Sequence, residues 1–167
     1  LVMFTICWSI CVYYPLVHMV WAPHGLLARL GAVDFAGGLV VHVNAGITAL
    51  ILSAWVGRRK DVHSQLNNLS WVLIGTALLW IGWYGFNAGS ALAVNDTAVQ
   101  AMLTTTISCS SAMVTWMLLD RYHFNHVTLA GVCNGAITGL VAITPGAGYV
   151  TLGGSMFIGI VGAIVSQ

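Results

Sequence analysis

The sequence predicts an all-α membrane protein, a polytopic bundle of transmembrane helices. Hydrophobic residues make up 59% of the 167 residues and charged residues only 5%, and the mean hydropathy is +0.91. A soluble domain of this composition would expose a large apolar surface to water. The five basic and four acidic residues also fall in four short groups between uncharged apolar runs. Each uncharged run is therefore a candidate membrane span.

Six apolar runs follow one another along the chain. About 20 residues at about 1.5 Å each cross the hydrocarbon core of a bilayer, and five of the six runs are long enough to do so. The first run lacks an initiating Met and a basic leading segment, so it predicts a span and not a signal peptide. We expect a fragment of one multi-pass transmembrane domain, located in the cell membrane. Its predicted spans are residues 1–21, 35–56, 69–94, 97–119, 127–144 and 153–167, the last of them truncated.

The basic residues predict which loops face the cytoplasm. The loops after the second and fourth runs contain Arg58, Arg59, Lys60 and Arg121, whereas those on the other side contain only Arg29. Cytoplasmic loops are enriched in Lys and Arg, so the first span is expected to run from inside to outside. A formal net charge of +1 without a basic tract argues against a nucleic-acid partner.

The cysteines and glycines of the spans favour structural roles. No Cys-x-x-Cys pair occurs, so we interpret the cysteines as buried structural thiols and expect no disulfide framework, metal site or cofactor. Gly131, Gly135 and Gly139 recur every four residues in the fifth run, a spacing that predicts close helix packing. The cysteines are Cys7, Cys11, Cys109 and Cys133.

His42 is the first candidate for a functional residue, because an ionisable group at membrane depth suggests a functional site. It follows Asp34 by eight residues, which places it about 12 Å along the helix from the outer surface. Phe86 lies at a similar depth in the third run, and Ser90 shares its helix face at i+4. We expect these side chains to line one path, with Trp21 at its rim.

Such a path suits a small cation that can lose a proton. Aromatic faces attract an ammonium ion by about 0.5 to 2 kcal/mol, and the Ser90 oxygen can accept one of its N–H bonds. Ammonium can then give up a proton and cross an apolar passage as a neutral molecule, whereas potassium would meet the full desolvation penalty. His42 would accept a hydrogen bond from ammonia or relay its proton.

Each of these residues also has a structural interpretation. Trp21 at a span end is typical of the interfacial aromatic belt, and Phe86 alone would face lipid or the core. Asp34 precedes a helix and could cap its first N–H groups. His18 and His42 must also be considered as a haem-binding pair in an electron-transfer subunit.

Four segments, taken in order, resemble the Amt/Mep/Rh ammonium transporter family, and its Amt/Mep branch in particular. The likeness covers essentially the whole chain. The segments are HMVW ending at Trp21, DFAGGLVVHVNAG beginning at Asp34, WIGWYGFNAGS ending at Ser90, and AGVCNGAITGLVAITPGAGYV at residues 130–150.

The resemblance implies a homotrimer of subunits that each contain eleven spans in two inverted repeats around one pore. This chain would match spans four to eight and part of span nine. It would be a transporter of ammonium or ammonia and not an enzyme; an ammonium-sensing receptor on the same scaffold is the alternative. The site residues implied by the resemblance are Trp21 and Ser90 for recruitment, Phe86 for the gate, His42 for the pore, Asp34 for the mouth and Tyr13 for the vestibule.

Overall fold

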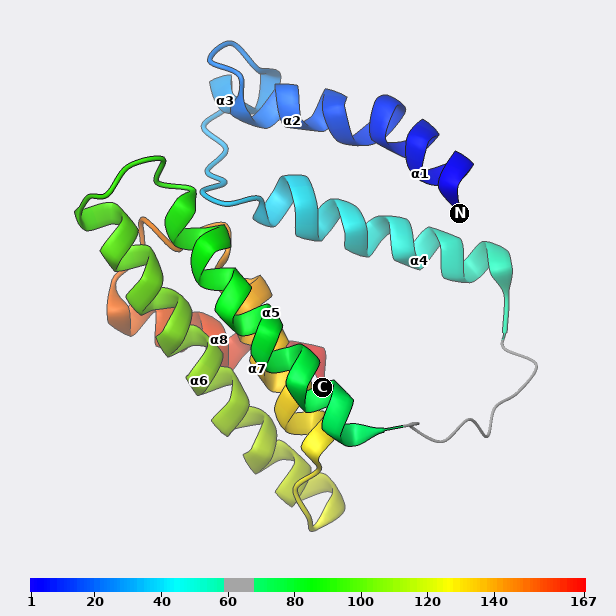
Figure 1. Cartoon of the computed structure of the whole chain (residues 1–167), viewed down its shortest axis with the longest axis vertical. Helices are drawn as coiled ribbons and strands as arrows, with labels where there is room; N and C mark the ends of the chain where they lie inside the picture. Colours follow the sequence, from blue (N-terminus) through cyan, green and yellow to red (C-terminus); the bar gives the residue numbers. More distant parts are fainter. Residues whose placement is uncertain (59–67) are drawn as a thin grey trace.

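The computed structural model describes residues 1–58 and 68–167, and within these ranges every regular element is helical (Figure 1). The elements in chain order are α1 (Val2–Trp8), the π-helical segment η1 (Ser9–Tyr13), α2 (Tyr14–Trp21), α3 (Leu26–Arg29), the π-helical segment η2 (Gly38–Val43), α4 (Asn44–Val56), α5 (Leu69–Gly89), α6 (Asp96–Phe124), α7 (Leu129–Ile143) and α8 (Leu152–Ser166).

Four helical stretches of the described residues are long and apolar enough to cross a membrane: Val2–Arg29, Gly38–Val56, Leu69–Gly89 and Asp96–Phe124. The helices α7 and α8 are shorter and apolar. The fold class predicted from composition is confirmed, and the chain is part of a multi-pass membrane protein.

The helices form two groups that meet near the start of the second span. In one group the first helix, made up of α1, η1 and α2, lies beside α4 (Figure 1). The Trp8 indole N–H links the two by donating to Thr48 Oγ1 at 3.0 Å. In the other group α6 packs against α5, α7 and α8. The Phe35 amide donates to the Pro145 carbonyl at 3.0 Å, and this bond ties the first group to the loop after α7.

Small residues allow α6 and α7 to approach closely, as the glycine spacing predicted. A Cβ atom at Gly135 would lie 2.8 Å from Trp116 Cβ, and one at Gly139 would lie 2.5 Å from the Ser108 carbonyl oxygen. The Ser108 hydroxyl also donates to the Gly139 carbonyl at 2.8 Å. Any larger residue at these two positions would therefore push the helices apart.

Two of the four cysteines are not buried. Cys109 and Cys133 lie in the core as expected, but Cys7 and Cys11 are exposed. They belong to the first helix, whose contacts in the described part of the chain are mainly with α3 and η2 and along its own length. A position within an apolar run therefore does not show that other residues of this chain bury the cysteine.

Several helix boundaries differ from those expected. The third span ends at Gly89 and not near residue 94, because the chain turns there and Leu92 takes a positive φ of 55°. The helix α6 continues to Phe124, past the expected end at residue 119, and stops at Asn125 with φ 61°. Asp120 thus lies in a helix and not in a loop. The basic residues Arg59 and Lys60 of the orientation argument are outside the described residues.

Candidate functional site

The second span begins beside Asp34, whose carboxylate accepts hydrogen bonds from the free backbone amide groups at the start of the helix. Its Oδ1 accepts from Gly37 N, and its Oδ2 accepts from Leu39 N and Val40 N, all at 3.0 Å. Asp34 is buried, and its charge complements the positive end of the helix dipole. The span starts three residues later than expected, at Gly38, because Gly37 takes the left-handed conformation with φ 104°.

Trp21 is fixed at the same end of the span. Its indole N–H donates to the backbone carbonyl of Asp34 at 2.8 Å, while 45% of the residue stays exposed. Trp21, Asp34 and Tyr149 border a hollow of about 520 Å³, together with Val20, Ala32 and Val33. Tyr149, which the sequence did not single out, packs edge-on against Phe35 at 5.3 Å between ring centroids.

His42 lies within an aromatic cluster contributed by α5. Its ring stacks on Trp83 at 5.3 Å with an interplanar angle of 22°, and lies 5.8 Å from the ring of Phe86. Trp83 and Phe86 are themselves 5.5 Å apart. The structure therefore brings together the two membrane-depth residues that the sequence placed at similar depth, His42 and Phe86.

Thr144, the residue that ends α7, connects this cluster to the other helix group. Its hydroxyl oxygen lies 3.2 Å from His42 Nε2 and receives the Trp83 indole N–H at 3.1 Å. The hydroxyl in turn donates to the Leu140 carbonyl at 2.8 Å. Thr144 is fully buried. Three helical segments, η2, α5 and α7, thus meet at one hydroxyl group.

Ser90 and Tyr13 have different positions relative to this cluster. The Ser90 hydroxyl donates to the Phe86 carbonyl at 2.8 Å, which holds it one turn above the Phe86 ring with its oxygen lone pairs still available. Tyr13 stacks on Trp8 at 5.8 Å and tilts against Tyr14. The residues that border the hollow next to Trp21 do not include Ser90.

Sequence reasoning missed two members of the cluster. Trp83 precedes Phe86 by three residues, and an i, i+3 pair shares one helix face, so its position was detectable. Thr144 is separated from His42 by 102 residues and is one of many hydroxyl residues in the apolar runs. No pattern in a single sequence marks it.

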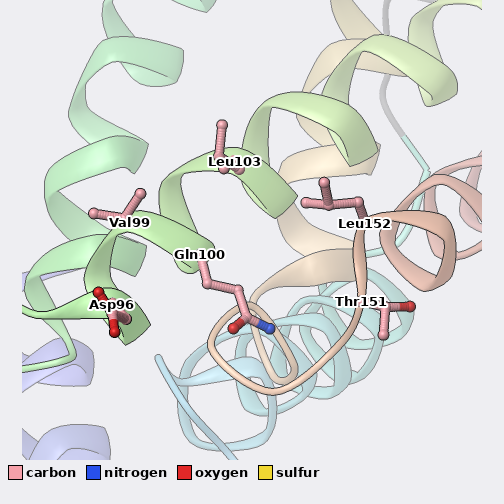
Figure 2. A pocket seen from close by; sticks show the side chains of 6 residues that line it. All are labelled: Asp96, Val99, Gln100, Leu103, Thr151 and Leu152. Carbon is pink, nitrogen blue, oxygen red and sulfur yellow. The ribbon is translucent and has the colours of Figure 1, made fainter.

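Another hollow, of about 450 Å³, lies between the start of α6 and the start of α8 (Figure 2). Gln100 points from α6 toward the loop before α8, where its amide donates to the Val150 carbonyl at 2.7 Å. None of the residues bordering this hollow was predicted for the functional site. They are Asp96, Val99, Gln100, Leu103, Thr151 and Leu152.

The described residues provide no cluster of three metal-ligating side chains. His18, the second histidine of the haem alternative, is exposed. The ring of His42, in contrast, is in contact with Trp83, Phe86 and Thr144.

The long apolar helices place the chain in the class of multi-pass membrane proteins. The chain belongs to the Ammonium Transporter Family, whose model matches residues 1–167. This is a family of transport proteins and not of enzymes.

Similar proteins from several sources match nearly the whole chain. An ammonium transporter of Aquifex aeolicus is 48% identical over 163 residues, which are 98% of this chain and 38% of that protein. The crystal structure of Candida albicans Mep2 is 40% identical with a TM-score of 0.92, covering 98% of this chain and 38% of that one. A structure described as a sensor Amt protein is 30% identical with a TM-score of 0.88, covering 95% and 43%.

The chain therefore spans about two fifths of the length of the proteins that it resembles. The sequence-based assignment to the family is confirmed.

Proposed function

We propose that the full-length protein to which this chain belongs carries ammonium or ammonia across the cell membrane, as a homotrimer, along a path that passes Trp21, Ser90, Phe86 and His42. The observation that carries the proposal is the packing of His42 against Phe86 and Trp83 at membrane depth. The name of the Aquifex aeolicus relative supports the same substrate.

The outer part of the path would recruit the cation. Trp21 is 45% exposed and Phe86 is 39% exposed, so ring surface is accessible, and an aromatic face attracts a cation by about 0.5 to 2 kcal/mol. The proton of the Ser90 hydroxyl is already donated to the Phe86 carbonyl. Its lone pairs therefore remain available to accept N–H bonds from ammonium. Tyr13, in the first span, is proposed to shape the vestibule.

The inner part of the path would select against metal cations. Phe86 and His42 mark its entrance, and passing them as a neutral molecule avoids the cost of taking an ion out of water. Ammonium can give a proton to the His42 imidazole there and continue as ammonia, whereas potassium has no proton to give. Asp34 contributes indirectly, because its carboxylate holds the start of the helix that carries His42.

The test uses the full-length parent protein, purified and reconstituted into lipid vesicles. An ammonium gradient should drive ammonium into the vesicles, whereas a potassium gradient of equal size should drive no potassium uptake. The parent should also restore growth on limiting ammonium in cells that lack their own transporter. The 167-residue segment alone should not, because a pore built from inverted repeats needs helices from both. A parent that moves neither ammonium nor ammonia would refute the proposal.

An ammonium sensor is the second candidate, because the sensor Amt protein has the same arrangement of helices over this segment. A sensor would bind ammonium through the same outer residues and signal through a separate domain. Ammonium binding by the parent without flux across vesicles would favour this function.

A further inference from the structure

The indole of Trp21 is bonded to a peptide group that also binds the loop after α7. Its N–H donates to the Asp34 carbonyl oxygen at 2.8 Å. The same peptide group contains the amide of Phe35, which donates to the Pro145 carbonyl at 3.0 Å. A peptide group is planar and rigid, so its carbonyl and its N–H keep a fixed relative direction. The position of the Trp21 indole is therefore linked through one peptide plane to Pro145.

The loop after α7, residues 144–151, is a firm support for this peptide group. Within the loop, the Tyr149 amide donates to the Gly146 carbonyl at 2.8 Å. The Thr104 hydroxyl of α6 donates to the Ala147 carbonyl at 2.7 Å, and both residues are fully buried. Breaking a buried bond of this kind is costly, because its donor and acceptor would be left without partners. The loop is therefore anchored to α6.

Two glycines let the start of the second span fit closely against this loop. A Cβ atom at Gly148 would lie 2.4 Å from Phe35 Cε2, and one at Gly38 would lie 2.5 Å from Pro145 Cδ. Non-bonded carbon atoms pack best at about 3.5 to 4.0 Å, so neither position has room for a side chain. The Phe35 ring thus lies directly on the backbone of the loop, as the Pro145 ring lies on the backbone of the second span.

We propose that Phe35 is a positioning residue for Trp21. Its amide and its ring hold the peptide group that receives the indole, and both do so against the same anchored loop. Phe35 does not touch ammonium in this account and acts only through the place of Trp21. The role of Trp21 in recruitment belongs to the proposed function, so the effect of Phe35 on transport rests on that function. The effect of Phe35 on the position of Trp21 does not.

The experiment follows Trp21 by ¹⁹F NMR of the full-length parent in lipid, with fluorine-labelled tryptophan. The signal that is missing from Trp21→Leu identifies this residue. The backbone of Gly148 has no positive φ, so Gly148→Ala acts through the methyl group that it places against the Phe35 ring, and it should shift or broaden the Trp21 signal. Gly153→Ala, whose Cβ meets no described atom within 4 Å, is the matched control and should leave the signal in place.

A double-mutant cycle tests whether the effect passes through Phe35. Phe35→Ala removes the ring and should itself broaden the Trp21 signal, because the backbone bond to Pro145 is then left without the packing of the ring. Adding Gly148→Ala to this variant should change the signal no further, because the new methyl group no longer meets a ring.

Uptake measurements separate positioning from a general loss of stability. Gly148→Ala should raise the half-saturating ammonium concentration by about two- to thirtyfold, the range expected for the loss of a cation–π contact. The maximal rate should be retained. A variant that is only less stable would instead lower the amount of active protein, and with it the maximal rate, at an unchanged half-saturating concentration.

The outcomes separate this inference from the transport function. An unchanged Trp21 signal in Gly148→Ala, an equal change in Gly153→Ala, or a full effect of Gly148→Ala without the Phe35 ring would each overturn the inference. A fall in the maximal rate alone would overturn its effect on recruitment. If Gly148→Ala does not fold, an unchanged Trp21 signal in Phe35→Ala overturns it. A parent with the expected spectra that moves no ammonium would refute the transport function and leave the positioning of Trp21 intact.

Discussion

Replacing Asp34 by Ala should strongly destabilise the outer end of the second span. The carboxylate accepts three backbone N–H bonds at 3.0 Å, from Gly37, Leu39 and Val40, and Asp34 is only 8% exposed. Each buried donor left without a partner costs about 1 to 3 kcal/mol. Taking the lower value for all three gives about 3 kcal/mol, more than the typical loss of about 1 kcal/mol for a helix cap.

The assay is thermal unfolding of the full-length parent in detergent, followed by tryptophan fluorescence. Asp34→Ala should lower the midpoint the most. Asp34→Asn should fall between it and the parent, because the amide keeps one acceptor oxygen but turns an N–H₂ group toward a backbone donor. Trp21 should become more mobile in both, since its indole bonds the Asp34 carbonyl. Equal midpoints for the parent and Asp34→Ala would show that the capping bonds do not hold this helix start.

Two further results are expected in the full-length parent. Trp21→Leu removes an aromatic face and Ser90→Ala removes an acceptor, so each should weaken the free energy of ammonium capture by no more than about 1 to 2 kcal/mol. The effect should appear as reduced uptake at limiting ammonium concentration. Unchanged uptake in both variants would mean that recruitment occurs elsewhere. Gly139→Ala should destabilise the protein by about 1 to 3 kcal/mol, since its Cβ would lie 2.5 Å from the Ser108 carbonyl oxygen. Gly85→Ala, whose Cβ meets no described atom within 4 Å, is the control, and equal unfolding midpoints for the two variants would contradict the packing.

Composition and charge placement were enough to predict the fold class and the approximate helices. They failed at helix ends, because apolar content does not reveal a turn. The segment after Gly89 is as apolar as the helix before it, yet the chain turns with a positive φ at Leu92. In contrast, Asp120 and Arg121 were taken for a loop because they are charged. Asp120 lies in α6, where its Oδ2 accepts from the Thr128 amide and hydroxyl.

For the candidate site, the sequence predicted how deep residues lie along each helix better than it predicted which helices pack together. Depth along two helices placed His42 and Phe86 at one level, and their rings lie 5.8 Å apart. The position of Asp34 before a helix predicted a cap, and its oxygens accept three amide groups there. Thr144 was missed because its contact with His42 exists only once α7 has packed beside η2.

Ammonium current and potassium uptake, measured side by side, show whether ammonium loses a proton at an apolar passage beside His42. The parent is compared with His42→Glu and His42→Ala. A buried carboxylate can offset the desolvation of a bare monovalent ion, so His42→Glu should let potassium compete or pass. His42→Ala should either lower the ammonium flux or leave a flux that carries no net charge. Parental ammonium flux with unchanged potassium exclusion in both variants would contradict the account and leave His42 a packed histidine of the core.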